Sequence, residues 1–116
     1  MNREAAERRG RSAEALAAWY LRLKGWRILA RRVRVAGGEV DIVARRGRVV
    51  AFIEVKARST QDAAGFALDH WRLRRVAVAA ERIAGRYVRP GDDIRIDALF
   101  VVPRRWPRHM PNVWQG

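Results

Sequence analysis

Polar and apolar residues alternate in two stretches of the first half of the chain, and the alternation predicts two β-strands. Residues 39–43 (EVDIV) begin with a polar–apolar alternation, and residues 49–56 (VVAFIEVK) are rich in the β-branched residues that favour strands. Residues 45–48 (RRGR) lie between them, and their glycine indicates a tight turn. We therefore expect a β-hairpin over residues 38–58.

The side chains of this hairpin divide between two faces, because residues two positions apart along a strand share a face. The polar faces are expected to carry Glu39, Asp41, Glu54 and Lys56, and the opposite faces Val40, Ile42, Ile53 and Val55. If the strands pair across the turn, Asp41 and Glu54 converge. Two carboxylates on neighbouring strands could then share one cation.

Apolar residues at helical spacing predict two helices. The first covers residues 13–24, with Ser12 as its N-cap and Gly25 at its end. Its buried face is expected to hold Ala13, Leu16, Ala17, Tyr20 and Leu21. The second covers residues 66–87, and its buried face is expected to hold Leu73, Val76, Ala77, Ala80, Ile83, Ala84 and Tyr87. A separate stripe of arginines follows the second helix: Arg72, Arg75, Arg82 and Arg86.

Two further strands complete the expected elements, over residues 26–35 and 94–102. The second of these is apolar enough toward its end for burial on both faces. Residues 1–11 are expected to be a frayed, flexible start, and residues 103–116 an extended tail with at most one short strand. The order helix, three strands, helix, strand predicts a single α/β domain of 116 residues with a mixed sheet and a helix on each face.

Charge is the most unusual feature of the composition. The formal net charge is +13, a surface that attracts polyanions, of which nucleic acid is the commonest. A coding bias toward arginine is the alternative explanation, since Lys24 and Lys56 are the only lysines among 25 basic residues. Cysteine is absent, which excludes disulfides and thiolate metal sites. No apolar run could cross a bilayer, and no signal peptide is evident, so we expect a cytoplasmic protein.

The hairpin acids suggest phosphodiester hydrolysis. Mg²⁺ prefers hard oxygen ligands, and Asp41, Glu54 and the carbonyl of Val55 could supply part of its coordination. Lys56 could orient the attacking water or stabilise the transition state. The alternative is that Glu54 and Lys56 form only a surface ion pair. Glu14 lies at the margin of the first helix's buried stripe, and its alternative role is that of an acid favoured by the helix dipole.

The chain resembles the YraN-like family of small bacterial endonuclease-like proteins, within the PD-(D/E)xK nuclease superfamily. The resemblance covers about residues 10 to 114 through five segments in order: SAEALAAWYLRLKGWRIL, GEVDIVA, FIEVKAR, RRVAVAAERI and IRIDALFV. It implies the restriction-endonuclease-like αβββαβ core and a Mg²⁺ or Mn²⁺ ion. It places Asp41, Glu54 and Lys56 at metal-binding and catalytic positions, and Glu39 as an accessory metal ligand. Glu14 matches the first-helix acid of archaeal Holliday-junction resolvases, and would complete the metal cage.

One departure from the family's pattern and one analogy accompany this resemblance. Arg72 stands near a position where the family often has a lysine, so a lysine's role there is not open to this chain. His70 and His109 are expected to take no part in proton transfer. Resolvases act as symmetric dimers, and that analogy alone leaves a homodimer open to this chain.

Three functions are compatible with these patterns. The first is a divalent-metal-dependent endonuclease acting on DNA, with branched or single-stranded DNA as candidate substrates, whose phosphates the arginine stripe and Arg58 would hold. The second is a nucleic-acid-binding module on a nuclease scaffold, weakly active or active only with a partner. The third is an interaction domain without nucleic acid. The first is favoured because all four candidate catalytic positions, Glu14, Asp41, Glu54 and Lys56, are filled.

Overall fold

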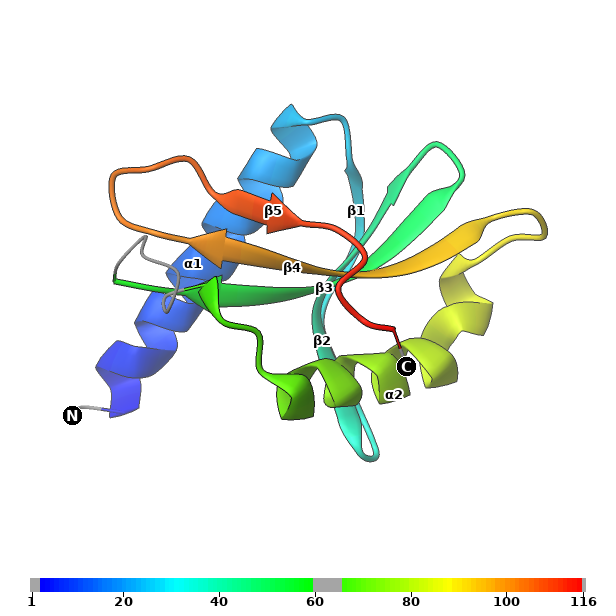
Figure 1. Ribbon diagram of the computed structural model, residues 1–116, viewed down its shortest axis with the longest axis horizontal. Helices are drawn as coiled ribbons and strands as arrows, with labels where there is room; N and C mark the ends of the chain where they lie inside the picture. The colour runs from blue at the N-terminus through cyan, green and yellow to red at the C-terminus, as the bar shows by residue number, and fades with distance from the viewer. Residues whose placement is uncertain (1–2, 60–65, 116) are drawn as a thin grey trace.

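The described residues fold into one five-stranded sheet and two helices (Figure 1). The computed structural model describes residues 3–59 and 66–115. The elements in chain order are α1 (Arg3–Leu23), β1 (Arg27–Val35), β2 (Gly38–Arg46), β3 (Val49–Ala57), α2 (His70–Tyr87), β4 (Asp93–Val101) and β5 (Arg108–Met110). This order confirms the expected αβββαβ core, and β5 is the short strand expected in the tail.

The sheet is mixed, as the connections require. Its strands follow the order β1-β2-β3-β4-β5, and every neighbouring pair is antiparallel except β3 and β4. Tight turns join the antiparallel strands β1, β2 and β3, whereas the parallel pair is joined by the α2 crossover. The two strands that carry the hairpin acids therefore lie near the middle of the sheet.

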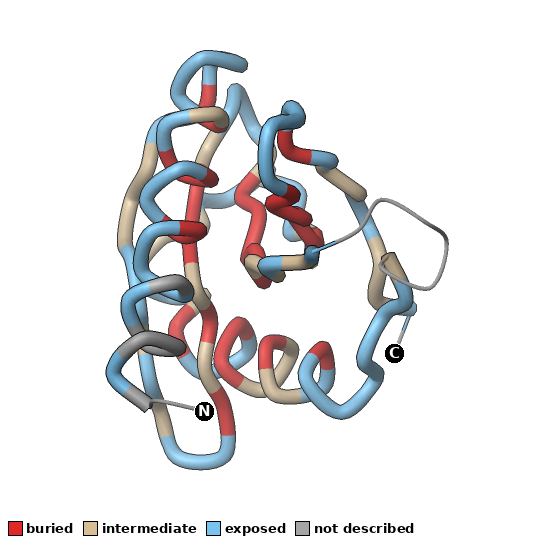
Figure 2. Tube along the Cα trace, turned by 90° about the vertical axis from the view of Figure 1, so that its left-hand side faces the viewer, coloured by how far each residue is buried: buried red, intermediate tan, exposed pale blue. Residues whose placement is uncertain are grey.

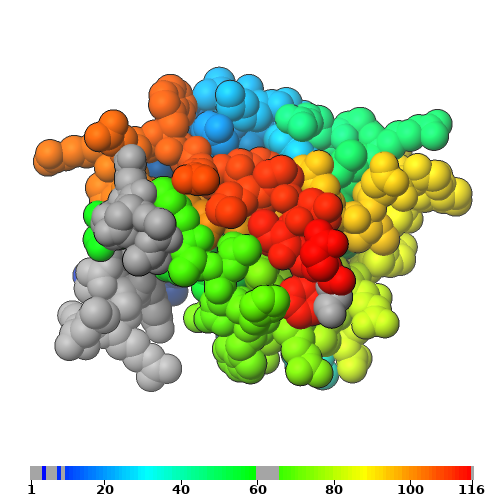
Figure 3. All heavy atoms as spheres, in the orientation of Figure 1, coloured from blue at the N-terminus to red at the C-terminus, as the bar shows by residue number. Residues whose placement is uncertain are grey.

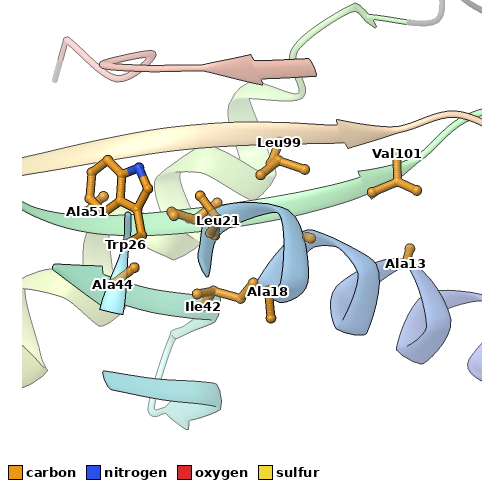
Figure 4. Close-up of a cluster of buried hydrophobic side chains, with 11 residues drawn as sticks. Ala13, Ala18, Leu21, Trp26, Ile42, Ala44, Ala51, Leu99 and Val101 are labelled. Carbon is orange, nitrogen blue, oxygen red and sulfur yellow. The ribbon is translucent and has the colours of Figure 1, made fainter. Parts of the chain in front are cut away.

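The two helices cover opposite faces of this sheet, each with its own core. On one face Leu21 and the alanines of α1 pack against Ile42, Ile53 and Leu99 (Figure 4). On the other, Val76 and Ile83 of α2 belong to a cluster with Val43 and Phe52. Figure 2 shows the buried residues gathered on the strands and on the inward sides of the helices. Glu54 lies on the central strand β3, directly after the residues of that strand that are buried in these two cores.

The first helix departs from the prediction at its start. It begins at Arg3 instead of Ala13, so Ser12 lies inside the helix and is not its N-cap. Residues 3–11 lack an apolar face, but they are rich in alanine, glutamate and arginine, which are strong helix formers. The buried face also differs, because Leu16 is 39% exposed whereas Ala18, which was not expected in the core, is fully buried.

The second helix is shorter than predicted and begins at His70 instead of Phe66. The Asp69 carboxylate accepts hydrogen bonds from the backbone N–H groups of Trp71 and Arg72, at 3.0 and 3.2 Å. This is the usual N-cap arrangement, and it fixes the first turn at a point that apolar periodicity could not locate. On its buried face Ala79 is fully buried, whereas the predicted Ala77 and Ala84 are half-buried.

Strand β2 does not keep the regular alternation predicted for it. Val40 packs in the core beneath α2 and Ile42 in the core beneath α1, so the expectation that they share a face is wrong. The β1–β2 ladder omits the pair of Arg32 with Asp41, and Arg32 has a left-handed φ of 53°. This local irregularity changes the side-chain direction at Asp41.

Gly38 is the first residue of β2 and touches the backbone of α2. A Cβ at this position would lie 2.4 Å from the carbonyl oxygen of Arg75, so only glycine allows this approach. The contact brings Glu39 to the first turns of α2. Within the described residues, no helix is long and apolar enough to cross a membrane.

Candidate active site

Asp41 and Glu54 lie where the β2–β3 ladder ends. The last pair of this ladder is Ile42 with Ile53, and Asp41 and Glu54 are the next residues on the two strands. Beyond that pair, the Val55 backbone N–H donates a hydrogen bond to Oδ2 of Asp41 at 2.7 Å. A side-chain carboxylate therefore ties the two strands together where the ladder stops.

Asp41 is an acid in an unfavourable environment for its charge. Burial raises its pKa from 3.8 to about 6, the Val55 N–H opposes the rise, and the carboxylates of Glu54, Glu14 and Glu39 add to it. Among the side chains that the structure describes, no basic group forms a salt bridge with Asp41. Its negative charge is therefore poorly compensated.

Glu54 is more deeply buried, at 4% exposure, but it has one cationic neighbour. Its Oε1 lies 3.0 Å from Nζ of Lys56, and both side chains are largely shielded from water. Burial raises the pKa of Glu54, and the hydrogen bond and charge of Lys56 oppose the rise. The ion pair considered from the sequence is thus present, but it is buried and lies beside Asp41, not on a solvated face.

Glu14 is buried on α1, at 6% exposure, and it is held by two arginines of β1. Nε of Arg31 and Nε of Arg32 each lie 3.1 Å from its Oε1, and Arg32 also contacts Oε2 at 3.1 Å. The left-handed backbone of Arg32 accompanies this arrangement. Neither arginine was singled out from the sequence, and only the consecutive pair inside a strand could have suggested that one of them turns inward.

Glu39 lies between β1 and α2, where it contacts two cations loosely. Its carboxylate is 3.6 Å from Nε of Arg34 and 3.4 Å from Nη1 of Arg72. Its side chain is 29% exposed. Glu39 is therefore a hydrated acid at the edge of the site.

A cavity of about 410 Å³ brings several of these groups together. Glu14, Glu39, Asp41 and Val55 line it, together with the cations Arg11, Arg32, Arg34 and Arg72. Glu54 and Lys56 are not part of its lining. No group of three or more acidic or histidine side chains lies close enough to hold a metal ion in the part of the chain that the structure describes. The predicted four-acid cage is therefore not preassembled.

The predicted phosphate-binding arginines occupy two regions. Arg72, Arg82 and Arg86 are exposed on α2, and Arg75 is half-buried with its guanidinium 5.2 Å from the Trp71 ring. Arg58 lies elsewhere, just beyond β3, with its guanidinium 5.7 Å from the Phe100 ring. The α2 stripe is near the acids, since Arg72 contacts Glu39. The charge of Arg72 also opposes the rise that burial causes in the pKa of Glu54.

A further buried acid, Asp97 of β4, was not singled out from the sequence. It is fully buried and receives hydrogen bonds from Arg95, at 3.0 and 2.9 Å, and from the Asn112 N–H. Nε2 of His109 lies 2.7 Å from its Oδ2. Burial alone would raise the pKa of Asp97, but these hydrogen bonds outweigh it and the net pKa is lowered. This cluster ties the C-terminal segment to the sheet.

Comparison with known proteins places the chain in a family and assigns the fold. The model of the family described as "Uncharacterised protein family UPF0102" matches residues 13–101. A UPF0102 protein of Sphingopyxis alaskensis is 62% identical over 115 residues, covering 99% of each chain. Another, of Rhizorhabdus wittichii, is 56% identical over 119 residues, covering all of this chain and 99% of its own.

A solved structure is also similar, that of Hjc, a Holliday junction resolvase of Archaeoglobus fulgidus. The TM-score is 0.59 at 21% sequence identity, and the match covers 89% of this chain and 72% of the resolvase chain. This likeness confirms the nuclease-like fold expected from the sequence, and the family match confirms the YraN-like resemblance. The chain belongs to the UPF0102 family.

Proposed function

We propose that this protein is a divalent-metal-dependent endonuclease that hydrolyses phosphodiester bonds of DNA, with branched or single-stranded DNA as its substrates. One observation carries the proposal: Asp41 and Glu54 follow the last pair of a ladder on neighbouring strands, both have raised pKa values, and the charge of Asp41 is poorly compensated. Such an arrangement is costly for the fold, and costly acid pairs are characteristic of functional sites.

The chemistry of the donors fits a hard cation. Mg²⁺ and Mn²⁺ take carboxylate and carbonyl oxygens, which Asp41, Glu54 and Val55 would supply, with Glu39 and Glu14 as further acids beside the same cavity. A bound cation would polarise a phosphate oxygen and lower the pKa of water. The carboxylates of Glu54, Glu14 and Glu39 disfavour the charge of Asp41, and a bound cation would relieve this repulsion.

The neighbouring cationic side chains would bind the phosphates of the substrate. Lys56 is confined beside Glu54, so its ammonium would be positioned at the reacting phosphate instead of at the surface. Arg72 contacts Glu39 at the rim of the cavity, and with the rest of the α2 stripe it would hold flanking phosphates. The similarity to Hjc supports a branched DNA substrate, because that protein is a Holliday junction resolvase. A homodimer and a cytoplasmic location remain predictions.

A nucleic-acid-binding module that is weakly active or needs a partner is the second candidate. Its specific support is that three of the four proposed catalytic side chains, Glu14, Glu54 and Lys56, are held by opposite charges within the protein. Glu14 is bound by Arg31 and Arg32, and Lys56 is bound by Glu54. On this alternative, DNA or a partner would have to release them.

A cleavage panel tests the proposal. Duplex, single-stranded, flap and four-way DNA are incubated with the protein in Mg²⁺, in Mn²⁺ and in chelator. We expect metal-dependent cleavage of at least one substrate that Asp41→Asn and Glu54→Gln abolish. Binding without cleavage under every condition would favour the second candidate, and cleavage that persists in both variants would contradict the proposed site.

A further inference from the structure

A second cavity lies on the opposite side of α1 from the acids. It is an open groove of about 1,510 Å³ between α1 and the connection from β4 to β5. That connection is the orange segment projecting at the left edge of the space-filling view (Figure 3). None of the proposed metal ligands lines the groove. The residues that line the groove therefore need a separate explanation.

The groove exposes large apolar side chains to water. Trp106 is 68% exposed, Trp19 49% and Leu16 39%, and all three line it. The rings of Trp19 and Trp106 are parallel within 4°, with centroids 6.1 Å apart, and Tyr20 flanks Trp106 at 6.2 Å. Two exposed, parallel indoles present flat apolar faces on which a further planar ring can stack.

The charge around these rings is of one sign. Four arginines line the groove, Arg8, Arg58, Arg104 and Arg105, and no acid is among the described residues that line it. The side chain of Arg58 is held in place by the Phe100 ring and by a 3.0 Å hydrogen bond from its Nη1 to the carbonyl of Ala57. The chemistry that complements this groove combines planar apolar rings with regularly spaced negative charges.

We propose that the groove binds unpaired nucleotides of single-stranded DNA, with bases stacked on Trp106 and Trp19 and phosphates beside the arginines. Bases in a duplex are already stacked on one another, so only an unpaired strand can offer its faces to the indoles. A second copy of the chain is a poor occupant, because a two-fold contact would bring the same arginines together in a protein of net charge +13.

The position of the groove suggests what it is for. Ala57, Arg58 and Ser59 line it, and they follow directly on the strand segment that carries Glu54 and Lys56. A single DNA strand lying in the groove would thus pass the C-terminal end of β3 and continue toward the proposed active site. This use rests on the proposed endonuclease function, and it would direct that activity to substrates with a single-stranded arm. The binding itself requires no cleavage.

The test measures binding without catalysis. Fluorescein-labelled oligo-dT of about 12 nucleotides, a length typical of single-strand sites, and a blunt duplex of equal length are titrated with the full chain in chelator. Trp106→Ala and Trp19→Ala should each weaken oligo-dT binding roughly 5- to 150-fold and change duplex binding less than about twofold. Trp106→Tyr, which retains a ring, should recover most of the loss. Leu23→Ala, an exposed change on the same helix outside the groove, is the matched control.

Salt dependence separates stacking from charge. Trp106→Ala should leave the slope of log K against log[salt] unchanged, whereas Arg104→Ala and Arg105→Ala should each reduce it by roughly 0.7.

Thermal melting confirms that each variant is folded, and Trp106→Ala, at a highly exposed position, is the variant on which the conclusion depends. Unchanged oligo-dT binding by Trp106→Ala, or an equal loss for the duplex, would overturn the proposal. So would sedimentation showing a dimer that Trp106→Ala dissociates while oligo-dT binding persists. Asp41→Asn should bind oligo-dT normally, so loss of cleavage and loss of groove binding are distinguishable.

Discussion

Two carboxylates of the same sheet, one half-buried and one fully buried, have opposite electrostatic surroundings. Asp97 on β4 has no exposed surface and is surrounded by donors: Arg95, His109 and the Asn112 N–H. Asp41 on β2 accepts a hydrogen bond from the Val55 N–H and faces three other acids. Its pKa is raised to about 6, whereas that of Asp97 is lowered.

The difference means that the charge of Asp97 stabilises the folded protein, whereas the charge of Asp41 destabilises it. A buried charge is stabilising only when its partners replace the lost water, as they do around Asp97. Around Asp41 they do not, and the site retains an unfavourable charge that a cation could neutralise. Removing each acid should therefore change stability in opposite directions.

The largest effect is expected at Asp97. Asp97→Ala would leave Arg95 and the Asn112 N–H without their shared acceptor, and breaking a buried pair in this way costs roughly 3–5 kcal/mol. Denaturant unfolding at neutral pH measures the loss. The control is Asp93→Ala, an exposed acid on the same strand, which should change stability little. Equal effects of the two substitutions would show that the Asp97 cluster contributes nothing special.

The second effect has the opposite sign and concerns Asp41. Because its folded pKa is raised from 3.8 to about 6, its ionisation disfavours the fold, by nothing below pH 3.8 and by up to about 3 kcal/mol above pH 6. Asp41→Asn keeps an acceptor for the Val55 N–H and removes the charge. In chelator it should stabilise the protein at pH 8 and have no such benefit at pH 3.5. A variant less stable than the parent at pH 8 would mean that the charge of Asp41 is compensated after all.

Asp97 predicts the mirror-image pH dependence. Its folded pKa is lowered, so its contribution to stability is complete above the ordinary value of 3.8 and is lost as the pH falls further. Comparing the parent with each variant over pH 3–8 therefore assigns the two branches of the stability profile to the two acids.

Glu14 should show an intermediate effect, because it is buried but paired. Glu14→Gln would weaken its charge-assisted hydrogen bonds from Arg31 and Arg32, at a cost of about 1.5–3 kcal/mol. An acid that only favoured the helix dipole would cost about 0.3–1 kcal/mol. Thermal melting measures the loss of stability and so separates the pairing with arginine from the helix-dipole role. Calorimetric metal titration shows whether Glu14→Gln also weakens metal binding. Exposed Glu81→Gln on α2 is the control.

The smallest change in stability is expected for the α2 arginines, which act on a ligand and not on the core. Arg72→Ala combined with Arg75→Ala should weaken duplex binding similarly for all sequences. It should also flatten the salt slope by roughly 0.9 for each phosphate that the variant no longer neutralises. An unchanged slope would assign these arginines to solvent, to Glu39 and to Trp71.

What the sequence predicted well was local and periodic. In a β-hairpin the position of the turn fixes which residues face each other on the two strands. Locating the turn at Gly47 was therefore enough to predict that Asp41 and Glu54 lie together. Burial is the largest cause of the raised pKa of Asp41, and the charge of Glu54 adds to it. The helix order likewise sufficed for the crossover and the mixed sheet.

What it did not predict depends on long-range contacts or single backbone angles. The arginines that hold Glu14 lie on β1, and His109 and Asn112 reach Asp97 from β5 and the segment after it, so no spacing along the chain encodes these contacts. Arg95, the other partner of Asp97, lies two residues away on the same strand. The switch of faces between Val40 and Ile42 accompanies one left-handed residue, Arg32, which is not a glycine. The groove forms only because the segment after β4 returns to α1 and places Trp106 beside Trp19.

Metal-dependent thermal melting tests most directly whether Asp41 and Glu54 hold a divalent cation, which is the central claim. Mg²⁺ at about 100 times its Kd should stabilise the parent by about 2.7 kcal/mol. Asp41→Asn and Glu54→Gln should remove this gain, whereas Lys56→Ala should keep much of it while losing cleavage. If both acid variants retain the full Mg²⁺-induced rise in Tm, the cation binds elsewhere and the proposed site is wrong.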